Sequence, residues 1–122
     1  MYERIETSPG TIGIRLGETL TIDEINQLYA DAAEALTSHE RLNYFVDASA
    51  WSHAGLQAGL HSLKMRLAHL DWFHRFERVA VVTDSVLLGG SVKLLDLLTP
   101  MMDVRAFPPT DAEAGLRWCE GG

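Results

Sequence analysis

Hydrophobic residues in the first part of the chain recur at intervals typical of strands and then of a helix. Two short segments, Tyr2 to Thr7 and Thr11 to Leu16, flank the turn-forming sequence Ser-Pro-Gly and predict a β-hairpin. Thr21 and Glu24 have the spacing of a capping box, which starts a helix. This helix is predicted to reach about Thr37. Its apolar side is formed by Ile22, Ile25, Leu28, Tyr29, Ala32 and Leu36.

After this helix, strands and helices are predicted to alternate to the end of the chain. Arg41 to Asp47 is rich in β-prone residues, and Arg78 to Asp84 holds an apolar run typical of a central strand covered on both faces. Leucines from Leu56 to Leu70 step by three or four residues and predict a helix. The other predicted elements are a helix from Val86 or Leu87 to Leu98, a strand from Asp103 to Phe107, and a terminal helix that opens with a second capping box, Thr110 to Glu113.

The predicted order of elements is ββαβαβαβα, which places the chain in the α/β class. We expect a mixed sheet of about five strands, joined by right-handed crossovers. About four helices are expected, packed mainly on one side of the sheet. A length of 122 residues suits a single core, so we expect one domain over residues 1–122.

Composition and charge narrow the classes of function. Hydrophobic residues make up 47% of the chain and charged residues 22%, as in ordinary globular proteins. The net charge of −7 repels phosphate backbones, so we expect no nucleic-acid partner. Cys119 is the only cysteine and Met1 to Gly10 contain no apolar run, which indicates the cytoplasm and no signal peptide. The leucine-rich stretch Val86 to Leu98 is too short to cross a bilayer, so no integral membrane segment is expected.

Several segments give the chain a resemblance to a known family. They are Gly17 to Asp23, Leu42 to Asp47, Phe76 to Asp84, and the tail formed by Val104 to Pro108 and Ala114 to Trp118. With the order of elements, they resemble the SpoIIAA-like family, which is related to the STAS fold of anti-sigma-factor antagonists. The resemblance implies a STAS-like fold and a non-enzymatic role in a bacterial cell. That role is regulation through protein–protein contact, or binding of a small apolar or anionic ligand.

The resemblance also implies a place to look for phosphorylation. In STAS regulators, an Asp-Ser-Ser-Gly-Leu motif after the third strand carries a serine that a partner kinase phosphorylates. The corresponding segment here is Ser52 to Leu56, in which His53 and Ala54 stand where the motif has hydroxyl residues. Ser52 or Ser49 remain as candidates for such a switch.

Polar side chains follow two of the predicted strands. Ligands in open α/β sheets tend to bind at the carboxyl ends of parallel strands, beside helix N-termini. The structural alternative is that Asp47 makes a turn and that Asp84 or Ser85 caps a helix. The candidate binding residues at this edge are Asp47, Ser49, Ser52 and His53 from one loop, with Thr83, Asp84 and Ser85 from the next.

The sequence favours neither enzymatic nor metal chemistry. His53, His61 and His69 are eight residues apart, which is ~12 Å along a helix, so one metal ion cannot bridge them. Cys119 has no sequence sign of activation, and no Gly-x-Ser-x-Gly elbow occurs. We therefore expect no catalytic residue, no metal and no cofactor.

The predicted helix from Leu87 to Leu98 is apolar nearly all round. Leu87 and Leu88 contribute to this excess. The leading hypothesis is that this helix, with the preceding helix Leu56 to Leu70, binds a protein partner, such as a second copy of the chain. A thick ordinary core is the structural alternative.

The rival hypothesis belongs to a different class of function. It is a carrier or sensor that holds a lipid-like or other small apolar ligand between these two helices, with transient membrane association. The expected apolar pocket opens near Trp51, Trp72 or Phe73.

Overall fold

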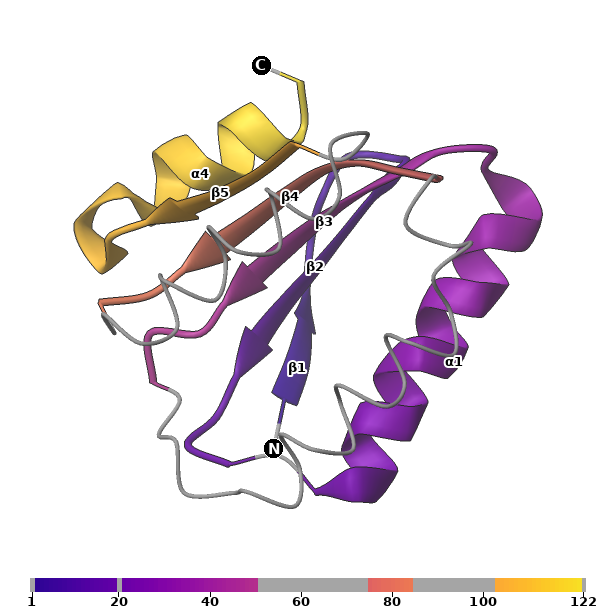
Figure 1. The fold of residues 1–122 in the computed structure, drawn as a ribbon, viewed down its shortest axis with the longest axis horizontal. Coiled ribbons are helices and arrows are strands. Elements are labelled where there is room, and N and C mark those ends of the chain that lie inside the picture. The colour runs from indigo at the N-terminus through magenta and orange to yellow at the C-terminus, as the bar shows by residue number, and fades with distance from the viewer. Residues whose placement is uncertain (1, 20, 51–74, 85–102, 122) are drawn as a thin grey trace.

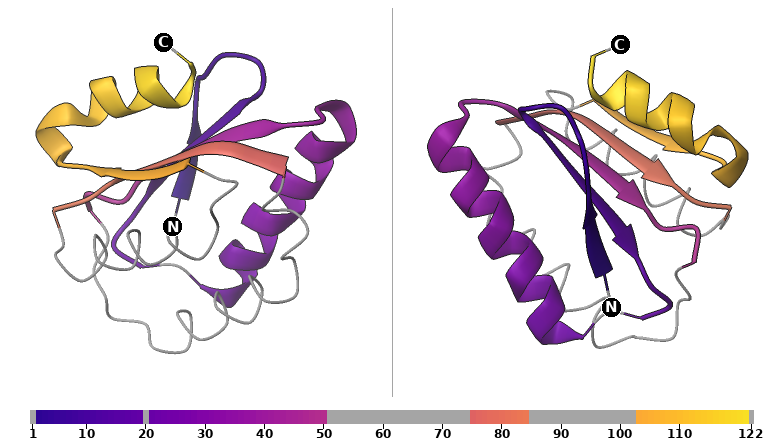
Figure 2. Two further views of the ribbon diagram at one scale, coloured as in Figure 1. Left: turned by 45° about the horizontal axis from the view of Figure 1, so that its top comes forward. Right: turned by 180° about the vertical axis from the view of Figure 1, so that it is seen from behind.

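Five strands form one mixed sheet in the computed structural model, which describes residues 2–19, 21–50, 75–84 and 103–121. The order across the sheet is β1-β2-β3-β4-β5 (Figures 1 and 2). β1 and β2 are antiparallel, and the other three neighbouring pairs are parallel. The predicted hairpin and the mixed sheet are therefore confirmed. The strands are β1 (Tyr2–Ile5), β2 (Thr11–Leu16), β3 (Leu42–Asp47), β4 (Phe76–Val82) and β5 (Asp103–Phe107).

The parallel register aligns residues of different strands in rows across the sheet. Ile12 pairs with Tyr44, Tyr44 with Val79, and Val79 with Val104. Because successive residues of a strand point to opposite faces, neighbouring rows lie on opposite faces of the sheet. The next row consists of Gly13, Phe45, Ala80 and Arg105.

The loop between β1 and β2 is held by close packing and by a distant hydrogen bond. A Cβ atom on Gly13 would lie 2.6 Å from Cγ1 of Ile5 and 2.6 Å from Cγ2 of Thr7, so glycine is the residue that fits there. The backbone N–H of Ser8 donates to Oε2 of Glu120 at 2.6 Å. The loop is thereby tied to the far end of the chain.

α1 (Ile22–Ser38) begins with the predicted capping box. Oγ1 of Thr21 accepts a hydrogen bond from the Glu24 N–H at 3.1 Å, and Oε1 of Glu24 accepts one from the Thr21 N–H at 3.0 Å. These two bonds satisfy N–H groups that have no partner inside the helix.

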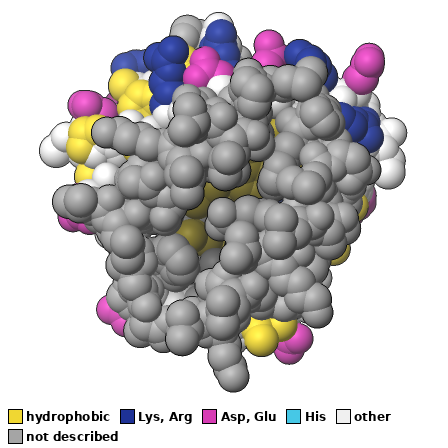
Figure 3. All heavy atoms as spheres, viewed as in Figure 1, with side chains coloured by type: hydrophobic (Ala, Val, Ile, Leu, Met, Phe, Trp, Pro, Cys, Tyr) yellow, Lys and Arg dark blue, Asp and Glu magenta, His cyan; other side chains and the backbone are white. Residues whose placement is uncertain are grey.

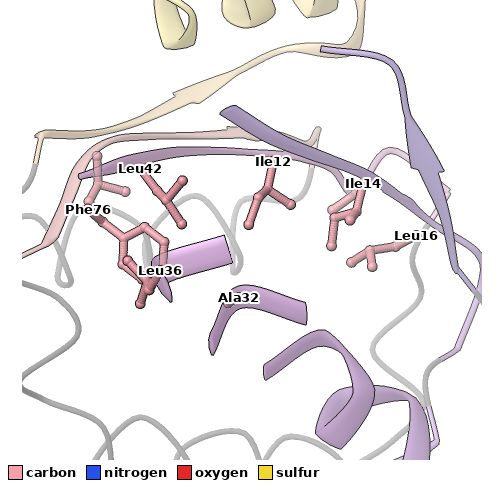
Figure 4. Close-up of a cluster of buried hydrophobic side chains, with 9 residues drawn as sticks. Ile12, Ile14, Leu16, Ala32, Leu36, Leu42 and Phe76 are labelled. Carbon is pink, nitrogen blue, oxygen red and sulfur yellow. The ribbon is translucent and has the colours of Figure 1, made fainter. Parts of the chain in front are cut away.

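The inner side of α1 packs on one face of the sheet (Figure 4). Ile22 is 41% exposed, so its predicted place on the apolar side is wrong. Three residues span about 300° of helix rotation, which offsets Ile22 by about 60° from the buried Ile25. The cluster on this face includes Ile12, Ile14, Leu16, Ala32, Leu36, Leu42 and Phe76.

α4 (Ala112–Cys119) lies on the opposite face of the sheet (Figure 2). There Cys119 clusters with Phe45, Ala80 and Val82. The two described helices thus lie on opposite faces, whereas we expected packing mainly on one side. α1 connects the parallel strands β2 and β3. The right-handedness of such crossover connections determines on which face of the sheet α1 packs. α4 follows the last described strand, and on the opposite face it buries the apolar side chains of β3 and β4.

The start of α4 differs from the prediction. A 3₁₀ helix, η2 (Pro109–Asp111), precedes it, and Asp111 is the N-cap without a side-chain hydrogen bond. The second capping box is therefore wrong. The fixed φ of Pro109 starts a tight turn one residue before Thr110, which places the threonine inside η2 instead of at a cap.

The strand predicted as central, Arg78 to Asp84, is not the middle strand of the sheet. It corresponds to β4, which lies beside the edge strand β5, whereas β3 occupies the middle. The predicted helices 56–70 and 86–98 lie outside the described residues. Neither of the α-helices in the described ranges has the length and apolar character needed to span a membrane.

Loss of the capping box should destabilise the fold. Thr21→Ala removes the side-chain acceptor for the Glu24 N–H, and we expect the free energy of unfolding to fall by about 1 kcal/mol. Urea denaturation followed by circular dichroism measures this change. Glu34→Ala, at an exposed position of the same helix, is the control and should change stability by less than about 0.5 kcal/mol. Equal effects of the two substitutions would contradict the assigned role of the cap.

Candidate functional site

The predicted polar edge is centred on Asp47, at the carboxyl end of β3. Oδ1 of Asp47 accepts hydrogen bonds from the N–H of Ser49 at 3.1 Å and from its hydroxyl at 2.5 Å. Oδ2 lies 3.4 Å from Nε of Arg15, whose Nη1 lies 3.0 Å from Oε1 of Glu3. The Asp47 carboxylate therefore closes a turn, as the structural alternative expected.

Arg15 was missed by sequence reasoning. It pairs with Asp47 across the parallel β2–β3 ladder and with Glu3 across the hairpin. The pairing of Arg15 with Asp47 follows from the register of β2 and β3. It could be predicted only if these two strands were known to be neighbours. The Arg15 side chain is 54% exposed, so this ion pair adds little stability and the Ser49 bonds hold the turn.

The second predicted loop does not join this arrangement within the described residues. The Thr83 N–H donates to the carbonyl of Phe107 at 2.9 Å and the Thr83 side chain is buried, while Asp84 is exposed. Among the bonds of the described ranges, none links Asp84 to Asp47 or Ser49. The other predicted binding residues lie outside the described residues. They are Trp51, Ser52, His53, Trp72, Phe73, Ser85, Leu87 and Leu88.

Reactive and metal-binding groups are sparse in the part of the chain that the structure describes. No three His, Cys, Asp or Glu side chains there are close enough to hold a metal ion. Cys119 is buried, and its burial raises the pKa of the thiol to about 11. At neutral pH the thiol is protonated, and a protonated thiol is a weak nucleophile.

The two faces of the central strands differ in a way that the sequence did not indicate. On the α4 face, Phe45 is 3% exposed and Ala80 and Val82 are 0% exposed. On the α1 face, Val79 and Val81 of β4 are only half-buried, although the apolar run predicted full cover. The half-buried side chains on this face are Tyr44, Val46, Val79 and Val81, which we call the apolar floor.

The apolar floor forms a continuous surface. Tyr44 pairs directly with Val79, and Val46 pairs directly with Val81. The two pairs are two residues apart along β3 and β4, so all four side chains are neighbours on the same face of the sheet. Described hydrophobic side chains are visible in a hollow near the centre of the space-filling view (Figure 3). Ala106, in the same row as Val81, is exposed.

Tyr44 is the polar member of the apolar floor. Its ring meets that of Phe76 edge-on, with centroids 5.9 Å apart and an interplanar angle of 85°. Burial, as the largest cause, raises the pKa of Tyr44 above its ordinary value. The side chain is therefore a neutral phenol at physiological pH, which can donate a hydrogen bond.

Comparisons with known proteins identify the family and agree with the fold. The model of the SpoIIAA-like family matches residues 11–120, which confirms the resemblance predicted from the sequence. Among solved structures, the chain is similar to an uncharacterised protein of the DUF3478 family with a SpoIIAA-like fold from Shewanella loihica PV-4. The two are 18% identical with a TM-score of 0.73, over 98% of this chain and 92% of that chain. At this identity the likeness shows the fold. No curated protein matches the chain.

Substitution of Asp47 should destabilise the turn. Asp47→Ala removes the acceptor of the Ser49 N–H and hydroxyl, and because Ser49 is exposed to water we expect a loss of about 0.5–1.5 kcal/mol in the free energy of unfolding. Asp84→Ala, which removes an exposed carboxylate after the next strand, should cost less than about 0.5 kcal/mol. Chemical denaturation of both variants measures the difference. A larger loss for Asp84→Ala would reverse the assignment.

Proposed function

The chain belongs to the SpoIIAA-like family, and we propose that it is a non-catalytic binding module that holds a small apolar ligand against the apolar floor. The observation that carries this proposal is the incomplete burial of Tyr44, Val46, Val79 and Val81. Parallel strands inside a sheet are normally covered on both faces. Half-buried apolar side chains on two neighbouring strands inside such a sheet support binding of an apolar molecule there.

The proposed site is a refinement of the rival hypothesis drawn from the sequence. That hypothesis placed the ligand between the predicted helices 56–70 and 86–98, near Trp51, Trp72 or Phe73. The apolar floor belongs instead to the sheet, on the face that carries α1. A ligand that covers the apolar floor removes valine and tyrosine surface from water. This contributes about 25 cal/mol to the free energy of binding for each Å² covered.

A non-catalytic role is supported by the state of the reactive groups described. The Asp47 carboxylate and the Ser49 hydroxyl are bonded to each other, and the Cys119 thiol is buried and protonated. We also propose a single domain over residues 1–122 and a cytoplasmic location. The net charge of −7 continues to disfavour nucleic acid.

Protein–protein contact through the predicted helices 56–70 and 86–98 stays a prediction, because it concerns residues outside those described. The same holds for phosphorylation at Ser52. A phosphate on Ser49 would place a charge of about −1.5 to −2 beside the Asp47 carboxylate. We propose that modification there would open the Asp47 turn.

One measurement separates these roles. Native mass spectrometry of the protein purified from its own cells reports copy number, a retained small molecule and a covalent phosphate together. We expect a retained apolar molecule, released when the protein is denatured. A homodimer with no retained molecule would support protein contact instead, and a phosphate on Ser49 or Ser52 would support the switch.

A larger side chain in the apolar floor should weaken ligand binding. Val79→Phe enlarges one half-buried side chain of the floor, and we expect the affinity for the fluorescent probe N-phenylnaphthylamine to fall at least about tenfold. Ala114→Phe adds comparable bulk at an exposed position of α4 and should leave the affinity unchanged. Circular dichroism establishes that both variants are folded. Unchanged probe binding in folded Val79→Phe, or no binding by the wild type, would refute the proposal.

A further inference from the structure

Two arginines meet at one tryptophan ring on the face of the sheet that carries α4. The Cζ atom of Arg105 lies 4.7 Å from the centroid of the Trp118 ring, and the Cζ atom of Arg78 lies 5.5 Å from it. Both distances are within the range of cation–π attraction. We call these three residues the arginine–tryptophan cluster. It lies on the opposite face of the sheet from the apolar floor.

The register of β4 and β5 places the two arginines side by side. Arg105 pairs directly with Ala80, and Arg78 is two residues before Ala80 on the same strand. Side chains two residues apart share a face of the sheet, so both arginines lie on the α4 face. The spacing of strands and of residues along them puts the two Cα atoms about 8 Å apart. Two positive charges are therefore held close together on a chain whose net charge is −7.

Contacts inside the protein account for Arg78 better than for Arg105. Nη1 of Arg78 donates to the carbonyl of Trp118 at 2.7 Å, near the C-terminal end of α4, where a cation is favourable. Arg105 is 56% exposed on the edge strand β5, and its Nε lies 3.6 Å from Oδ1 of Asp103, which is longer than a hydrogen bond. Among the described residues, Asp103 is the only carboxylate in ion-pair contact with the cluster, which therefore keeps an excess of positive charge.

The composition of the cluster indicates the kind of partner that it fits. A guanidinium group presents paired N–H donors that match the geometry of a carboxylate. Arginine and tryptophan are also enriched at the positions that contribute most to protein–protein binding. Trp118 is half-buried beside Phe107, so part of its indole remains open to apolar contact. A long polyanion would be repelled by the rest of this acidic chain, whereas a short acidic segment meets the cluster alone.

We propose that the arginine–tryptophan cluster binds an acidic segment of a partner protein, with carboxylates on the guanidinium groups of Arg78 and Arg105 and the segment packed against the Trp118 indole. This interaction surface is separate from the apolar floor and does not depend on the proposed function. It also differs from the predicted protein contact, which concerned helices 56–70 and 86–98.

An NMR titration tests the proposal. The probe is an octapeptide of alternating glutamate and serine, whose carboxylates lie about 7 Å apart when the peptide is extended. We expect it to shift the indole N–H signal of Trp118, which is identified by its loss in Trp118→Phe. Arg105→Gln should weaken binding at least about fivefold, because it removes a charged donor to a carboxylate. The matching octapeptide of glutamine and serine should not bind.

Arg4→Gln is the matched control, because Arg4 is an exposed arginine of the opposite edge strand, β1. It changes the net charge by the same amount and should leave the affinity within about twofold, since distant exposed charges are screened. Circular dichroism establishes that both variants are folded. No shift with the acidic peptide, or equal effects of Arg105→Gln and Arg4→Gln, would overturn the proposal. Binding of phosphatidylglycerol vesicles in place of the peptide, weakened by Arg105→Gln, would assign the cluster to a membrane surface and overturn the protein partner.

Discussion

The parallel register of β2, β3 and β4 is the constraint on which the other features depend. A shift of one residue between two strands would exchange their faces, because side chains alternate along each strand. The observed register pairs Arg15 with Asp47 and aligns Tyr44 with Val79. It therefore decides both the polar pairing at the carboxyl edge and the composition of the apolar floor. Neither feature is a property of one strand alone.

The two faces of the sheet differ in how completely their side chains are buried. α4 seals its face so completely that Ala80, Val82 and Cys119 have no exposed surface. This close packing stabilises the fold. The α1 face combines a buried cluster around Leu36 and Leu42 with side chains that remain partly open to solvent. A binding site requires such a surface, since a fully packed face leaves no volume for a ligand.

Local signals in the sequence predicted the elements well and their surroundings less well. The Thr21–Glu24 box and the five strands depend on nearby residues, so spacing alone identified them. The Thr110–Glu113 box failed because Pro109 changed the backbone before it. The Arg15–Asp47 pair required the strand order. The apolar floor could not be predicted, because the apolar run Val79 to Val82 is the same whether one face or both are covered.

The hydrogen bond from the Ser8 N–H to Glu120 joins groups that are 112 residues apart. During synthesis on the ribosome, the β1–β2 hairpin can form early because its contacts are local. Its loop cannot be anchored until residue 120 has been made and α4 has docked. The hairpin is thus completed by a residue made 112 positions later, so assembly of this edge of the sheet awaits the synthesis of α4.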